Sequence, residues 1–268
     1  MKSKQLKLYG REDISGREMQ ASIIPVCFFI FFITLTFMTA SLKLLLSTYP
    51  SFKGSDILAH KAPYAVNIIA ACAVLLFWIM FFAPAYIGMH DYFIAPVKNK
   101  NQNIDIIFDW YSFKKFFIGL KFVLGLILLK AFMLICFCTP SFIIFVFTIK
   151  TLFSQGIFKD CAYVILAGAC IMLGIGVMCY FCAKQRYAAV PYIAAMNPKV
   201  KLSDAIKASK KIMEGKYLNF LLFKLSFFGW FLSCVFLFPL MFVFPYYEQS
   251  CTEWIFYTAN KQKNKNNT

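Results

Sequence analysis

Five long apolar runs constrain this chain more than any other feature of its sequence. Each is longer than the ~20 residues that a helix needs to cross a hydrocarbon core of about 30 Å. Hydrophobic residues make up 60% of the 268 residues and charged residues 15%, whereas soluble domains are about 45–50% apolar and about 25% charged. The sequence therefore predicts an all-α, polytopic helical membrane protein with about five transmembrane helices plus short interfacial amphipathic helices.

The expected organisation is a single multi-pass membrane domain (22–259) between a basic N-terminal cytoplasmic tail (1–21) and a polar C-terminal tail (260–268). No linker or internal repeat divides the chain. The expected spans are residues 23–46, 64–87, 123–149, 161–183 and 217–244.

The third run, Phe116–Ile149, is longer than one span and leaves two arrangements open. One is a single tilted helix that starts near Gly125. The other is a surface helix over 113–122 followed by the span, which keeps Lys121 outside the core and Lys130 near one membrane face. We favour the second arrangement, because a lysine at the bilayer centre costs about 2.5–3.5 kcal/mol. Pro140 then lies inside the span and predicts a kink.

The fourth run carries a stripe of small residues, Ala167, Cys170 and Gly174, at helical spacing. In membranes such stripes let helix backbones approach closely. We therefore expect another helix to pack against this stripe.

Two shorter segments, 203–214 and 247–257, predict interfacial amphipathic helices. Gly215 is expected to end the first one. Ser209 and Met213 share one face of that helix, and a group of lysines points elsewhere, so we expect the helix to lie along the lipid headgroups. The lysines are Lys207, Lys210 and Lys211.

Basic residues outnumber acidic residues by 28 to 12, which gives a net charge of +16. They lie beside apolar runs, and no nucleic-acid-binding motif is present, so the expected partners are the lipid bilayer with its anionic headgroups, a membrane protein as an option, and no nucleic acid. With the N-terminus inside, the inner segments hold 17 Lys and Arg and the outer segments 7. This bias predicts a cytoplasmic N-terminus.

The acidic residues and histidines offer little for catalysis. All twelve acidic residues lie outside the expected spans or at their ends, whereas proton-coupled carriers place carboxylates inside the membrane. The neighbouring His90 and Asp91 form the one candidate pair, without a nucleophile or metal ligand at usable spacing. Because no catalytic or metal-binding motif is found, we expect no enzyme, no metal and no cofactor.

Lys130 and Lys224 are the charges that lie well inside apolar runs. They are candidate intramembrane polar contacts, for an anion or a lipid phosphate between helices. The ordinary alternative is that each stem snorkels to the membrane surface. Ser226 is a further candidate, for hydrogen bonding between helices.

The segment from Asp204 to Tyr257 contains Met-x-Gly-Lys at 213–216, followed by Ser-Phe-Phe-Gly-Trp at 226–230. With these residues it resembles a bacterial family of integral membrane proteins catalogued as domain of unknown function 975, over the last quarter of the chain. The family-like positions are Ser209, Met213, Gly215, Gly229, Trp230, Pro245 and Tyr246.

The resemblance implies a multi-pass protein of the bacterial cytoplasmic (cell) membrane, and it brings no activity, substrate or catalytic residue. The shared residues have an architectural interpretation. Gly215 ends a helix, Gly229 permits close helix packing, and Trp230 with Pro245-Tyr246 anchors the last span.

Three functions follow as hypotheses. The leading one is a non-catalytic accessory or scaffold protein whose basic cytoplasmic surface faces lipid or a partner. The alternative is a permease or exporter component for a small or lipidic solute, with Lys130 and Lys224 as contacts. The third is a lipid-modifying enzyme that uses His90 and Asp91.

Overall fold

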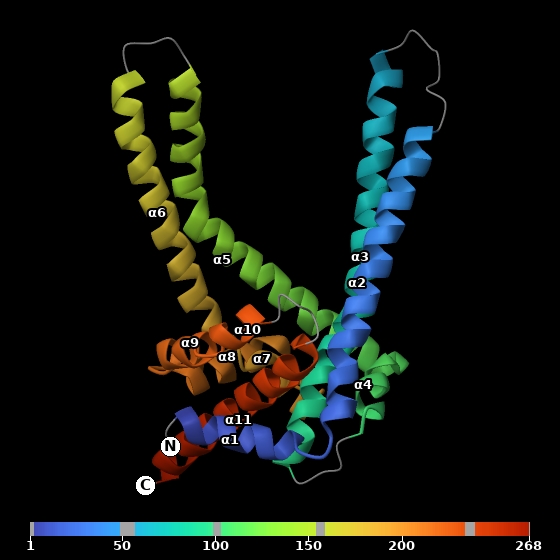
Figure 1. Cartoon of the computed structure of the whole chain (residues 1–268), viewed down its shortest axis with the longest axis vertical. Coiled ribbons are helices and arrows are strands. Elements are labelled where there is room, and N and C mark those ends of the chain that lie inside the picture. The colour runs from blue at the N-terminus through green and yellow to red at the C-terminus, as the bar shows by residue number, and fades with distance from the viewer. Residues whose placement is uncertain (1–2, 49–56, 99–102, 154–158, 234–238, 268) are drawn as a thin grey trace. The chain divides into compact units, whose positions relative to one another are not determined.

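The computed structural model describes residues 3–48, 57–98, 103–153, 159–233 and 239–267, and the regular elements in these ranges are all helices (Figure 1). The chain divides into two compact units. Unit 1 comprises residues 1–120 and 229–253, and unit 2 comprises residues 121–228 and 254–268. The helical class is confirmed.

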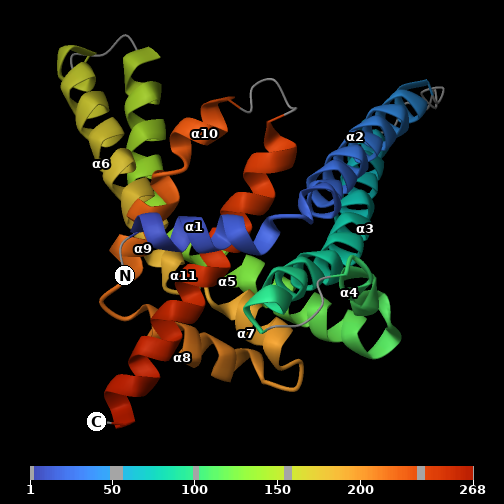
Figure 2. The same cartoon turned by 60° about the horizontal axis from the view of Figure 1, so that its bottom comes forward.

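Unit 1 is built on two long helices, α2 (Glu18–Thr48) and α3 (Ile57–Val97), which lie side by side in both views (Figures 1 and 2). Short elements cover the end of α3: α4 (Asp105–Phe108) and the 3-10 helix η1 (Asp109–Tyr111). Trp110 of η1 is fully buried there. Unit 1 also contains α1 (Ser3–Ile14), the first turns of α5, nearly all of α10 (Phe228–Ser233) and the first half of α11 (Leu240–Asn267). Phe228, the first residue of α10, belongs to unit 2.

The helix α3 continues ten residues beyond the expected end of the second span at residue 87. Met89, Tyr92 and Phe93 lie on this extension and are buried in the core of unit 1. His90 and Asp91 also lie on this extension, and both side chains have partners inside unit 1.

Unit 2 contains most of α5 (Phe113–Phe153), and α6 (Lys159–Gln185), α7 (Val190–Met196), α8 (Leu202–Met213) and α9 (Tyr217–Leu225), together with the second half of α11. The helix α5 is continuous, so the expected surface helix 113–122 and the third span form one element. It bends along its length (Figure 1) and has Pro140 inside it, in keeping with the kink that proline imposes.

The close approach of α5 and α6 occurs at Gly176, where a Cβ atom would lie 2.6 Å from the carbonyl oxygen of Phe137. The predicted stripe places the contact at Gly174, but no described atom lies within 4 Å of a Cβ built there. The stripe prediction was therefore wrong by about half a helical turn, because Gly174 and Gly176 face nearly opposite sides of the helix.

Three stretches of the described residues are long and apolar enough to cross a membrane: Cys72–Val97, Phe113–Lys150 and Val164–Met196. They contain most of the second, third and fourth expected spans. Their large apolar side chains are widely exposed, such as Phe147 at 68% and Val164 at 75%, a property that suits lipid as the surrounding solvent. The first expected span (23–46) is helical within α2, whose side chains are described only in part.

The fifth expected span (217–244) is not one helix, and this prediction was wrong. The run is divided into α9, α10 and the start of α11, and its residues 234–238 lie outside the described part. At the first break the Ser226 hydroxyl donates to the Phe223 carbonyl, and the Phe227 amide turns back to the Lys224 carbonyl. Such local side-chain bonds compete with helix continuation.

Both terminal segments were expected to be tails, and the described residues of both are mostly helical. Residues 3–14 form α1, with Leu6, Gly10 and Ile14 buried along one face. The expected interfacial helix 247–257 and most of the expected tail 260–268 belong to α11, which runs to Asn267. Gln262 binds the Lys211 and Ile212 carbonyls at 2.7 and 3.2 Å, so it caps the end of α8. This contact satisfies carbonyls at the end of α8 and holds the last turns of α11 in place.

Candidate functional site

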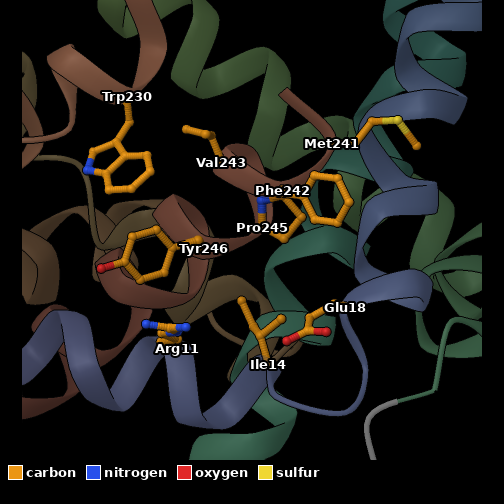
Figure 3. Close-up of a pocket in the computed structure, with 9 residues that line it drawn as sticks. All are labelled: Arg11, Ile14, Glu18, Trp230, Met241, Phe242, Val243, Pro245 and Tyr246. Atoms are coloured by element: carbon orange, nitrogen blue, oxygen red, sulfur yellow. The ribbon is translucent and has the colours of Figure 1, made fainter. Parts of the chain in front are cut away.

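A cavity of about 390 Å³ opens in unit 1 among α1, α2, α10 and α11 (Figure 3). Its size falls within the ~300–1,000 Å³ of small-molecule sites. The wall is mostly apolar, and the polar groups are an arginine, a glutamate and a tyrosine. The lining residues are Arg11, Ile14, Glu18, Trp230, Met241, Phe242, Val243, Pro245 and Tyr246.

Arg11 and Tyr246 form the polar end of this cavity, and their side chains lie next to each other in Figure 3. Burial raises the pKa of Tyr246, and the Arg11 guanidinium lowers it by a smaller amount. The phenol is therefore neutral at physiological pH and can donate a hydrogen bond. A guanidinium beside a phenol donor is a combination that binds carboxylates and phosphates.

Three of the family-like positions, Trp230, Pro245 and Tyr246, line the cavity. Trp230 is 58% exposed, and in Figure 3 its ring lies on the other side of Tyr246 from Arg11. Gly229 precedes it in α10, and no described atom lies within 4 Å of a Cβ built there. Among the described residues no helix packs closely against Gly229, in contrast to its expected role.

A buried polar network lies beside the cavity, where α1 crosses α11. The Gln249 amide, fully buried, donates to the Asp13 carboxylate at 3.0 Å. Glu253, one turn further along α11, shares a hydrogen bond with Asp13, and burial together with this neighbour raises the pKa of Glu253 to about 7. At the same crossing a Cβ on Gly10 would lie 2.6 Å from the Ser250 hydroxyl, so glycine is needed for the close approach.

His90 and Asp91 do not act as a pair, because they face different partners. The His90 Nδ1 atom lies 4.0 Å from a carboxylate oxygen of Glu248, an ion pair when the imidazole is protonated. Asp91 accepts a 3.0 Å hydrogen bond from the Trp110 indole. Consecutive residues on a helix are about 100° apart, and each of these two side chains has a structural contact on its own side.

The family-like Ser209 of unit 2 holds the turn between α6 and α7 against α8. Ser209 is fully buried, donates to the Arg186 carbonyl at 2.9 Å and accepts from the Ala189 amide at 3.2 Å. Met213 is also fully buried. Gly215 has a φ of 66°, a left-handed conformation that favours glycine, and it follows the last residues of α8 as expected.

The structure brings Lys130 and Lys224 into one neighbourhood of unit 2. Lys130 of α5, Lys184 of α6 and Lys224 of α9 lie close enough for their charges to act on one another. The Lys224 ammonium lies 4.5 Å from the ring of Phe220, one turn earlier in α9. Ser226, the third candidate, bonds the Phe223 carbonyl within its own segment.

The exposed side of α8 is basic. The buried face of α8 is formed by Ala205, Ser209 and Met213. Lys207, Lys210 and Lys211 are exposed, and at 100° per residue they centre on the opposite side of the helix. We call these three lysines the α8 surface. Unit 2 as a whole holds 16 Lys and Arg against 3 Asp and Glu, a formal charge of +13, whereas unit 1 holds 12 against 9.

No motif in the sequence singles out Arg11, Asp13, Gln249 and Glu253. These residues lie in segments that were expected to be a tail and an interfacial helix. One signal was available, since Leu6, Gly10 and Ile14 recur at every fourth position and indicate a helix with one buried face.

A family model described as "Protein of unknown function (DUF975)" matches residues 1–264 of this chain. The match covers nearly the whole chain, so the restriction of the resemblance to the last quarter was wrong, because the N-terminal segments carry family character as well. Comparison with curated proteins and with solved structures gives no significant match.

Proposed function

We propose that the chain, which belongs to the family described as "Protein of unknown function (DUF975)", is a multi-pass membrane protein that works without catalysis. It acts as an accessory or scaffold protein of a bacterial cell membrane, with a cytoplasmic N-terminus. Its basic α8 surface binds anionic lipid headgroups. The observation that carries the proposal is the arrangement of α8, whose apolar side is occupied by the protein and whose lysines face outward.

The buried face of α8 decides the mode of lipid contact. An amphipathic helix that inserts into a membrane needs a free apolar face. Here Ala205, Ser209 and Met213 are buried inside unit 2, so the helix contributes charge and no insertion. Each lysine near an anionic membrane surface contributes about 1 kcal/mol. The contact is therefore electrostatic and weakens as salt is added.

The test uses the full chain in nanodiscs of phosphatidylcholine with a minor share of phosphatidylglycerol. After partial removal of lipid, native mass spectrometry counts the lipids that stay bound. We expect phosphatidylglycerol to be retained above its share in the disc. The variant Lys207→Gln/Lys210→Gln/Lys211→Gln should lose this enrichment.

The matched control removes three exposed lysines elsewhere, Lys4, Lys114 and Lys121, and should keep most of the enrichment. Equal retention of both lipids by the natural protein, or an equal loss in both triple variants, contradicts the proposal. A stoichiometric protein retained after gentle extraction, without lipid enrichment, assigns the α8 surface to a protein partner instead.

A second candidate function is a permease or exporter component for a small or lipidic solute, and the mutual proximity of Lys130, Lys184 and Lys224 favours it. Three cations from three helices repel one another and attract an anion. Efflux of carboxyfluorescein from proteoliposomes is the measurement. It should fall on Lys130→Gln and persist on Lys150→Gln, an exposed lysine of the same helix. Efflux equal to that of protein-free liposomes removes this candidate.

A further inference from the structure

The geometry points to a ligand site in unit 1: we propose that the cavity among α1, α2, α10 and α11 binds one amphipathic anion. Such a molecule has a carboxylate or phosphate head and an apolar tail. The site lies in a different unit from the α8 surface, so the inference goes beyond the proposed function and does not rest on it.

The head of the ligand lies at Arg11. This guanidinium is exposed at the cavity, and the Tyr246 phenol lies beside it (Figure 3). Arginine presents a planar set of donors that matches a carboxylate or a phosphate, and a charged partner makes these hydrogen bonds stronger than neutral ones. Tyr246 adds a neutral donor from the other helix.

The tail of the ligand lies along α11 and α10. Met241, Phe242 and Val243 supply an apolar wall on α11, and Trp230 supplies an aromatic one on α10. Phe242 and Trp230 are each more than half exposed, so contact with a tail removes apolar surface from water, which is favourable. Methionine is flexible and tolerates tails of different shape.

Charge selects the anion over a cation. Glu18 also lines the cavity, on the far side of Ile14 from Arg11 in Figure 3. Arg11 is therefore the lining cation at the Tyr246 end, where the lining carboxylate Glu18 does not lie beside it. A carboxylate or phosphate there gains a cationic partner, whereas an ammonium head meets the guanidinium at short range.

The crossing of α1 and α11 holds Arg11 in position. The Gly10 backbone contacts Ser250, and Asp13 accepts from Gln249. These contacts lie within one turn of Arg11 on α1, so the guanidinium is carried by a helix that is fixed before the ligand arrives. A preformed site avoids the entropy cost of ordering the helix on binding.

The experiment places the full chain in phosphatidylcholine nanodiscs and titrates dodecyl phosphate below its micellar concentration, with tryptophan fluorescence as the readout. We expect a saturable change in the tryptophan fluorescence of the natural protein. The variant Trp230→Phe should not show this change. Arg11→Gln should raise the half-saturating concentration about tenfold, because a charge-assisted contact is lost. Lys4→Gln removes an exposed charge from the same helix and should leave binding unchanged.

Two comparisons keep the inference open to refutation. Dodecyltrimethylammonium and dodecyl maltoside have the same tail as dodecyl phosphate and a different head. Both should bind more weakly than dodecyl phosphate. Equal binding of all three probes, or no effect of Arg11→Gln in a protein with natural thermal stability, overturns the proposal. If Arg11→Gln unfolds, Tyr246→Phe tests the same polar end, and an unchanged affinity in that variant counts against the site.

A last arm identifies the source of the ligand. Phosphatidylglycerol in the nanodisc that competes with dodecyl phosphate assigns the site to a lipid of the bilayer. Binding that is indifferent to phosphatidylglycerol assigns it to a free amphiphile such as a fatty acid. Both outcomes keep the amphipathic anion. Replacement of the α8 lysines should leave the binding of dodecyl phosphate intact. The test of the cavity and the test of the proposed function can therefore fail independently of each other.

Discussion

The Gln249 amide on α11 donates a 3.0 Å hydrogen bond to the Asp13 carboxylate on α1, across 236 positions of the sequence. Both residues lie one turn or less from cavity-lining residues, Arg11 on α1 and Tyr246 on α11. This polar contact, together with the close approach of Gly10 to Ser250, therefore fixes the α1–α11 crossing beside the cavity.

Replacing Gln249 tests this contact. Gln249→Leu removes the donor and leaves the Asp13 carboxylate without it at a buried crossing, which should cost about 1–3 kcal/mol. Amide hydrogen exchange of residues 3–14 should become faster. The control Asn219→Leu changes an exposed amide on α9 and should leave exchange in α1 unchanged. If α1 exchanges at the natural rate in Gln249→Leu, then Gln249 does not hold it.

The raised pKa of Glu253 predicts that the stability of the α1–α11 crossing depends on pH. Burial, followed by the Asp13 hydrogen bond and charge, raises the pKa of Glu253 from 4.5 to about 7. The folded state therefore binds this proton more tightly than the unfolded state does. The resulting stabilisation is complete below about pH 4.5 and is lost as the pH rises through about 7.

Thermal unfolding of unit 1, followed through hydrogen exchange, should therefore occur at higher temperature at pH 5.5 than at pH 8. Glu253→Gln should flatten this dependence, because the amide is neutral at both values. Glu214→Gln, at an exposed carboxyl in unit 2, serves as control. A pH dependence that survives in Glu253→Gln would assign it to other groups.

Ser209→Ala tests the contact of α8 with the turn between α6 and α7. The hydroxyl is fully buried, and its loss leaves the Arg186 carbonyl and the Ala189 amide without this partner. We expect a loss of about 1–3 kcal/mol in the free energy of unfolding. Ser203→Ala makes the same chemical change at an exposed position of the same helix, and surface changes are usually within about 0.5 kcal/mol. Equal effects would show that burial is not the cause.

The two family-like glycines Gly215 and Gly229 should respond oppositely to alanine. Neither Cβ would meet a described atom within 4 Å, so space does not separate them. Gly215 has a positive φ of 66°, and alanine there costs about 1–2 kcal/mol of backbone energy. Gly229 lies in α10, where alanine stabilises a helix by about 0.5–1 kcal/mol. Thermal unfolding of the two variants is the measurement, and equal shifts would refute the conformational explanation.

Run length and composition determined the class of this protein from sequence alone. Stretches of more than 20 apolar residues have one stable environment as exposed helices, so the long helices α3, α5 and α6 were expected, and three stretches of spanning length lie in the described residues. Local backbone chemistry was equally readable. Gly215 ends α8 because a left-handed residue stops a helix, whatever surrounds it.

The tertiary structure alone decided the site. Arg11 meets Tyr246 and Asp13 meets Gln249 because a helix formed by residues 3–14 crosses one that begins at residue 240. His90 faces Glu248, while its neighbour Asp91 bonds Trp110. No periodicity in the sequence encodes which distant side chain a polar group will meet. That choice depends on packing between helices, because a buried polar group takes the partner that the whole fold places within reach.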